Sequence, residues 1–453
     1  MTLLVVMIAP LFLLCFPVFL TGTASIFASF ILFGFSALFL SLLARIRNSV
    51  PDMIFICVMN YIVALQVVSL LVWPDFIAFQ GGVFTTVTAT SPAIEKSLAL
   101  LSAFSLGWFI VLVFDRCDIA LEIDAINSKA ETHLSFFVGW FFISIIVSIL
   151  GALFLDLGIA GVESDFQYAG ILYYLFPVDY LVLVLVAALG LKIDKIKGKE
   201  KFFWLLIALY LVVKILCGWK SPLLNVFLVY TVGVYYRQGI RVILRLLPLG
   251  VLVLAGYIFA IKPIVEFVRT GEVDAGSYAE QSLDYNPFAG RLTEGTLFGI
   301  AVIELDGETT KIAMLDFLGD FVNRLVPGTL WDIKTIDRVF TEDVLGQHEG
   351  VASTFAPGML GMAQMLGGVF AAIMYGIFFR FLVFLLGRWG VSARQAIVKL
   401  YVIGVIPIFV VSLCIDGYFG GFEKLAVLGV VIAIFIRCCD YFNKWIPMRR
   451  QRV

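Results

Sequence analysis

Long uninterrupted apolar runs constrain this chain more than any other feature. Blocks such as "LVLVLVAALGL" (residues 181–191) recur along it, 61% of its 453 residues are hydrophobic, and its mean hydropathy is +1.03. A helix rises about 1.5 Å per residue, so roughly 20 apolar residues cross a hydrocarbon core of about 30 Å. The sequence therefore predicts an all-α polytopic membrane protein.

Reading the runs one by one gives twelve expected membrane spans. They are 3–20, 24–43, 53–73, 97–114, 135–155, 171–191, 202–218, 222–236, 246–261, 357–386, 397–415 and 422–441. Lys and Arg then fix the orientation, because they collect in the cytoplasmic connections of membrane proteins. With twelve spans every basic connection falls on one side, and the basic tail after residue 441 falls there too. Both termini are therefore expected in the cytoplasm. Reading the first run as a signal peptide would leave the other orientations unchanged.

Charge and composition exclude several classes of function. The formal net charge is −1, which gives no reason to expect a nucleic acid or another polyanion as partner. The seven cysteines lie in apolar runs or at expected cytoplasmic edges, which argues against a disulfide framework. His133 and His348, the two histidines, are far apart, and no nucleotide-binding motif is present. We expect neither a cofactor nor a metal; Asp306 and Glu308 form only an isolated acidic pair.

The span pattern divides the chain into three parts: spans one to nine in 1–262, a large external loop in 263–356, and the last three spans with the tail in 357–453. Ordered loops of this length commonly carry function. Acidic residues outnumber basic ones in this loop, which disfavours a general polyanion-binding surface. A few arginines in such a segment suit one small anionic group such as a diphosphate, with structural salt bridges as the alternative for each.

The loop contains one clear amphipathic segment, "IAMLDFLGDFVNRLV". Its apolar residues recur at three- and four-residue spacing, and its polar residues gather on the opposite side. The apolar set is Ile312, Leu315, Leu318, Val322 and Leu325; the polar set is Asp316, Asp320, Asn323 and Arg324. We expect a helix that ends before Pro327 and Gly328. It either lies on a membrane surface or packs on a small core of the loop itself.

Asp179 and Lys214 are ionisable residues that fall inside expected spans. Asp179 lies in the outer half of 171–191, and Lys214 lies about one turn inside the external end of 202–218. Ionisable groups at such depth cost roughly 2.5–3.5 kcal/mol on insertion scales and usually pair or line a cavity. We expect Asp179 and Lys214 to form an intramembrane polar pair in an outward-facing cavity. The alternative is that Lys214 extends to the surface by itself.

Small residues follow the loop at four-residue spacing. Gly368, Ala372 and Gly376 are expected to form a ridge that allows a close helix–helix approach inside the span 357–386. The "APGMLG" segment before them is expected to bend the start of this span.

Three motifs within residues 214–376 resemble those of the oligosaccharide repeat-unit (O-antigen) polymerases of the Wzy type. They are "GWKSPLLNVFLVY" at an external mouth, "RLVPGTLWDIK" in the loop, and "VASTFAPGMLGMAQMLGGV" at the start of the following span. The resemblance implies a glycosyltransferase fold of the GT-C-like kind in a bacterial inner membrane. It implies an undecaprenyl-diphosphate-linked oligosaccharide as substrate, transfer at the periplasmic face, membrane lipids as surroundings and a polysaccharide chain-length regulator as a further partner.

The resemblance also suggests roles for individual residues. Lys220, Arg324, Lys334 and Arg338 are the candidates for binding the substrate diphosphate. The candidate catalytic residues are Arg291, His348 and Glu349. His348 precedes Gly358 and Gly361 at nearly the spacing found in the related O-antigen ligases, but Glu349 replaces the small polar residue usual there.

Two other functions stay open on the sequence. A ligase-like glycan transferase shares the same substrate chemistry. A secondary transporter would be expected to show repeated halves with broken spans at matching positions, and no such internal symmetry is visible.

Overall fold

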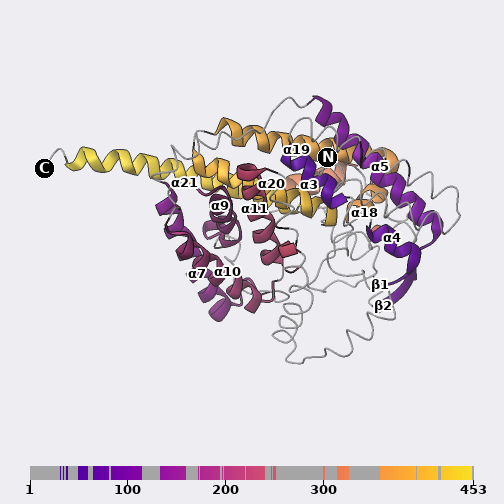
Figure 1. Cartoon of the computed structure of the whole chain (residues 1–453), viewed down its shortest axis with the longest axis horizontal. Helices are drawn as coiled ribbons and strands as arrows, with labels where there is room; N and C mark the ends of the chain where they lie inside the picture. Colours follow the sequence, from indigo (N-terminus) through magenta and orange to yellow (C-terminus); the bar gives the residue numbers. More distant parts are fainter. Residues whose placement is uncertain are drawn as a thin grey trace. The chain divides into compact units, whose positions relative to one another are not determined.

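The structure is a computed structural model of the whole chain, shown in Figure 1. It describes residues 31, 34, 37–38, 49–59, 65–80, 83–114, 133–159, 172, 174–193, 196, 198–219, 221–239, 246, 248–250, 252, 299–300, 314–325, 358–393, 395–416 and 420–450. The described elements fall into two compact units. The first comprises 1–119, 274–386 and 409–423, and the second comprises 120–273, 387–408 and 424–453.

The first unit is mainly helical. Its described elements are α3 (Val50–Val58), α4 (Leu65–Val72), the strands β1 (Asp75–Gln80) and β2 (Val83–Thr88), α5 (Ser91–Phe114), α16 (Met314–Leu325), α18 (Gly358–Met365) and the part of α19 (Val369–Ser392) up to Leu386. Helices α4 and α18 both pack against α5. Thr90 begins α5, because its side-chain oxygen accepts a hydrogen bond from the Ala93 amide.

Two glycines allow α5 and α19 to approach each other backbone to backbone. A Cβ atom at Gly107 of α5 would lie 2.0 Å from the Ile373 carbonyl oxygen, and one at Gly376 of α19 would lie 2.2 Å from the Phe104 carbonyl oxygen. Without a driving force from water, helices in lipid associate through such close packing of small residues. The sequence prediction of a small-residue ridge at Gly376 thus corresponds to a real helix contact.

The predicted ridge is nevertheless wrong at one position. Gly368 does not lie on the helix face, because 366–368 form a turn between α18 and α19 in which Gly367 and Gly368 have φ values of 124° and 75°. The expected single span 357–386 is therefore two helices. Two consecutive residues with positive φ end α18, and glycine adopts that conformation without the steric cost that a Cβ atom brings.

The strands β1 and β2 form an antiparallel hairpin, with Asp75 paired to Thr88 at its open end. There the Thr88 hydroxyl donates a hydrogen bond to the Asp75 carboxylate at 2.6 Å. The segment lies between the expected spans 53–73 and 97–114. The run of β-branched residues in "VFTTVT" is a strand signal in the sequence.

The second unit surrounds one helix that is buried on all sides. Its described elements are α7 (His133–Leu155), α9 (Val178–Leu191), α10 (Glu200–Leu216), α11 (Ser221–Gln238), the part of α20 (Ala396–Asp416) up to Ile408, and the part of α21 (Gly420–Arg450) from Lys424. Helix α9 contacts α7, α10 and α11, and every residue from Leu181 to Leu191 is buried. A helix that is apolar all round has no surface suited to water, so burial of this kind is its expected environment.

Four described helices are long and apolar enough to cross a membrane: Ser91–Phe114, Phe137–Leu155, Val369–Ser392 and Ala396–Cys414. The chain is thus a helical membrane protein, as its composition predicts. The count of twelve spans stays a prediction. The expected span 171–191 is not one continuous helix, because Phe176 and Pro177 interrupt it before α9 begins at Val178.

The backbone contact of α5 with α19 makes a direct stability prediction. Gly376→Ala should destabilise the protein by roughly 1–3 kcal/mol, since the new methyl group forces the two backbones apart. The matched control is Gly139→Ala on α7, where a Cβ atom would meet nothing within 4 Å. It should leave stability unchanged or raise it by up to about 1 kcal/mol. Melting temperatures in detergent, followed by size-exclusion chromatography, would check both, and equal effects would contradict the packing account.

Candidate functional site

A carboxylate, a lysine and a tyrosine meet at the start of the buried helix α9. The Lys214 ammonium donates a hydrogen bond to Oδ2 of Asp179 at 2.8 Å, and the Tyr210 hydroxyl donates one to Oδ1 at 2.7 Å. The Lys214 side chain is 9% exposed and that of Asp179 is 26% exposed. The structure therefore brings together the two ionisable residues that the sequence pairs, and it adds Tyr210 to them. We call Asp179, Tyr210 and Lys214 the Asp179 cluster.

Local structure explains why these side chains converge. Tyr210 and Lys214 are one turn apart on α10, so they share a face of that helix. Asp179 occupies the first turn of α9, two residues after Pro177, where the unpaired amides of a helix start favour a negative charge. Gly218, with φ of 84°, then turns the chain from α10 toward α11. The "GWKSPLLN" motif thus begins in the turn after α10, and from Ser221 onward its residues belong to α11.

Tryptophans join helix ends beside the Asp179 cluster. The Trp219 indole donates a hydrogen bond to the Gly158 carbonyl oxygen at 2.6 Å, which links the end of α10 to the segment after α7. The Trp140 indole donates one to the Leu175 carbonyl oxygen at 2.9 Å, just before the interruption that precedes α9. These bonds hold the helix ends around Asp179 in place.

The Asp179 cluster has an arrangement that chemistry can use. Two donors fix the carboxylate while about a quarter of its side chain stays exposed, so a further hydroxyl can reach it. A fixed carboxylate can accept the proton of a sugar hydroxyl, and a neighbouring ammonium can stabilise negative charge. Lys220 of the same motif lies outside the described residues.

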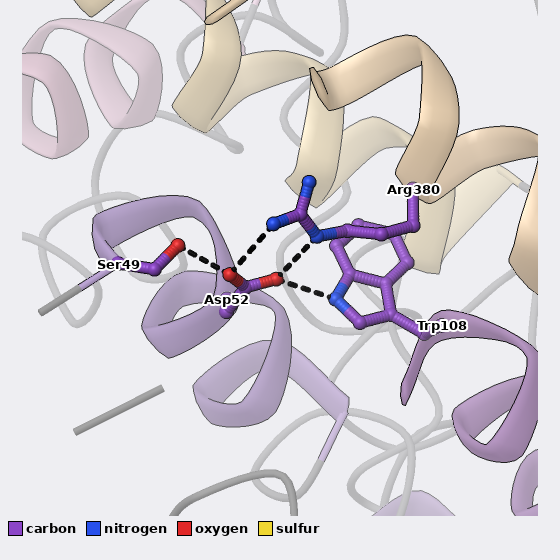
Figure 2. Close-up of polar contacts among 4 residues, drawn as sticks. All are labelled: Ser49, Asp52, Trp108 and Arg380. Atoms are coloured by element: carbon purple, nitrogen blue, oxygen red, sulfur yellow. Dashed lines mark hydrogen bonds and ion pairs between the residues drawn. The ribbon is translucent and has the colours of Figure 1, made fainter. Parts of the chain in front are cut away.

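A second polar cluster lies in the first unit, and the sequence analysis did not find it. The Asp52 carboxylate of α3 accepts hydrogen bonds from Nε and Nη2 of Arg380 at 2.8 and 3.1 Å and from the Trp108 indole at 2.7 Å. The Ser49 hydroxyl also donates to Asp52, as Figure 2 shows. Asp52 is fully buried and Arg380 is 2% exposed. These four residues are the Asp52 cluster.

The surroundings of the Asp52 cluster indicate a structural role. Phe55 stacks on the Trp108 ring at 3.9 Å with only 4° between the planes, and the Arg380 guanidinium lies 6.0 Å from that ring. No solvent-exposed surface reaches the carboxylate, so a substrate in water cannot touch it. The cluster connects α3, α5 and α19 through one buried ion pair with four hydrogen bonds.

The loop helix expected from the amphipathic segment is α16, and it ends at Leu325, before Pro327, as predicted. The side chains that α16 exposes are not those expected of a helix that packs on a core within the loop. Leu315 is 80% exposed and Leu318 is 43% exposed, whereas Phe317 and Asp320 are buried. Phe317 contacts Tyr375 of α19 with its ring centre at 6.0 Å. The two described leucines of the apolar face thus do not pack in a small core of the loop.

Most other predicted site residues lie outside the described residues. Arg291, Lys334, Arg338, His348 and Glu349 belong to this group, and their roles stay predictions. The backbone of Arg324 lies in α16, one turn after Asp320. Among the residues that the structure describes, no group of three or more His, Cys, Asp or Glu side chains is placed to hold a metal ion.

Comparisons with known proteins give no match: no family model, no curated protein and no solved structure is significantly similar to the chain.

A double-mutant cycle tests the ion pair of the Asp179 cluster. Asp179→Asn and Lys214→Met should each destabilise the protein, and the double variant should cost clearly less than the two single costs added. Coupling energies of about 0.5–3 kcal/mol are typical of residues in contact. Tyr210→Phe removes one hydrogen bond and should cost about 1 kcal/mol. Melting in detergent is the measurement, and strict additivity of Asp179→Asn and Lys214→Met would rule out the pairing.

The Asp52 cluster makes a different stability prediction, because its ion pair is sealed from water. Asp52→Asn or Arg380→Met alone leaves a buried charge without its partner, which typically costs about 3–5 kcal/mol. The apolar pair Asp52→Leu with Arg380→Met should be less damaging than either single change. Trp108→Phe keeps the ring beside Phe55 and should cost only about 1 kcal/mol. A double variant worse than both singles would contradict this account of the ion pair.

Proposed function

We propose that this protein is a polymerase of undecaprenyl-diphosphate-linked oligosaccharide repeat units, acting at the periplasmic face of a bacterial inner membrane. The observation that carries the proposal is the partly exposed Asp179 carboxylate held by Lys214 and Tyr210. In the orientation expected from the sequence, this cluster lies in the outer part of the membrane. The resemblance of three motifs to repeat-unit polymerases supports the same function.

The reaction requires a site at the boundary between lipid and water. A polyprenyl chain is too apolar to leave the bilayer, whereas its sugars need water. In the proposed step, a hydroxyl oxygen of the acceptor sugar forms a bond to the anomeric carbon of the donor. The bond from that carbon to the diphosphate breaks, the lipid diphosphate leaves with the electron pair, and the hydroxyl proton passes to a base. No nucleotide is consumed, which agrees with the absence of a nucleotide motif from the sequence.

Within this proposal Asp179 is the base for the acceptor hydroxyl. Lys214 and Tyr210 hold its carboxylate in one orientation, and positioning of this kind is a main source of catalytic rate. The predicted cationic residues, chiefly Lys220 and Arg324, would stabilise the charge that develops on the departing diphosphate. Lys214, already bound to Asp179, supplies further positive charge beside the reaction.

The test is the lipopolysaccharide or capsule profile of a deletion strain. Loss of the long ladder with retention of core plus a single repeat unit is expected. Core without any repeat would indicate a ligase-like transferase instead. Complementation with Asp179→Asn should fail to restore the ladder, since loss of a general base typically costs 10²–10⁴-fold in rate. Tyr210→Phe, at an equal level in the membrane, should restore it in part, and a full ladder with Asp179→Asn would exclude the role of Asp179.

A substitution that keeps charge tests the proposed diphosphate contact. Arg324→Lys preserves the positive charge but removes the planar fork that binds two oxygen atoms at once. The ladder should shorten markedly although the variant is present at a normal level in the membrane. Full polymer length with Arg324→Lys would reject the proposed role of this arginine.

The Asp179 cluster also suits a second function, secondary transport, because charged residues inside membrane segments often mark ion pathways. The same strains separate the two functions. A transporter of unrelated cargo would leave the ladder unchanged on deletion.

A further inference from the structure

We propose that α16 lies in the membrane interface, with its Leu315–Leu318 face inserted among the lipids and its opposite face held by the protein. The partner is thus the bilayer surface itself. The inference rests on the exposure of α16 and on its contact with α19, and it does not depend on the proposed enzymatic activity.

The first argument is the reversed polarity of the helix. Leu315, Leu318 and Val322 follow each other at three- and four-residue spacing and form one narrow face. The two leucines are 80% and 43% exposed, whereas Asp320, on another side of the helix, is 2% exposed. A helix packed on a protein core in water buries its leucines and exposes its carboxylates. Outward leucines with an inward carboxylate are stable where the outer medium is hydrocarbon.

The second argument is the depth at which α16 is attached. Phe317 contacts Tyr375, which lies six residues after the start of α19 at Val369. At about 1.5 Å per residue this is roughly 9 Å along the axis of a helix that is long enough to span a membrane. Interfacial helices bury their apolar face about 5–10 Å into the boundary between headgroups and acyl chains. With the external boundary of the membrane taken at the start of α19, the attachment point lies at the depth that such a helix occupies.

The third argument is the exposed apolar surface of α19, the helix that α16 contacts. Its first two turns also expose large apolar side chains, Phe370 at 73% and Met374 at 44%. Exposed side chains of this size suit lipid and not water. Asp316 is exposed as well, but its position on α16 is about 100° from that of Leu315. A helix lying in the interface would direct this carboxylate toward the headgroups and water.

Spin labels measure the immersion directly. Leu315→Cys, Leu318→Cys and the matched control Asp316→Cys would be labelled with a nitroxide in the full-length protein, reconstituted in phospholipid nanodiscs. The unsubstituted chain, treated in the same way, supplies the background from native cysteines. Collision of each label with oxygen, which concentrates in lipid, is then compared with collision with a water-soluble nickel chelate. All three positions are exposed, so the labels themselves should not disturb packing.

Labels at Leu315 and Leu318 should collide several-fold more with oxygen than with the nickel chelate, and the label at Asp316 should show the opposite preference. Preference for nickel at both leucine positions would place this face in water and overturn the inference. Protection from both reagents would mean that another protein surface covers the face, which would also overturn it. The result is independent of activity, so it stands or falls separately from the polymerase proposal.

Discussion

The ion pair between Asp52 and Arg380 is the interaction on which the first unit depends most. Arg380 lies midway along a helix that is apolar enough to span a membrane, where an unpaired cation is costly. The Asp52 carboxylate offsets this cost by pairing with the Arg380 guanidinium. Because this carboxylate is itself buried, it needs further donors, and Ser49 and Trp108 supply them. The pair also fixes the rotation of α19 about its axis. Gly376 then faces α5, and Tyr375 becomes available to hold Phe317 of α16.

The sequence predicted the structure correctly where the cost of placing a side chain in lipid or in water decides which structure forms. The apolar runs predicted spanning helices, and α5, α7, α19 and α20 are long and apolar enough to be such helices. The spacing of the loop leucines predicted α16, and the expense of charges in lipid predicted that Asp179 and Lys214 would meet. The spanning helices and α16 follow from local composition, and the contact of Asp179 with Lys214 follows from the need of ionisable groups in lipid for a partner.

Such rules do not predict which distant residue in the sequence becomes the partner of a buried charge. Arg380 inside an apolar run is itself a signal for a buried partner, but 328 residues separate it from Asp52, and nothing local selects that carboxylate. Asp52 stands just before the expected span 53–73, where an acidic residue is easily explained by water. The turn at Gly367 and Gly368 was missed for a related reason. Glycine spacing is the same whether glycine serves close helix packing or a left-handed turn, and only the backbone distinguishes the two.

The two clusters differ in one physical respect that separates structure from function. Asp52 has all its donors supplied by protein and no exposure, so its charge is committed to holding helices together. Asp179 has two donors and an exposed fraction, so its carboxylate keeps capacity for a hydroxyl from outside. A carboxylate bears four lone-pair sites, and two of them suffice to fix its orientation. A carboxylate that is held in place but not fully hydrogen-bonded by the protein can still bind a polar substrate at the edge of a membrane.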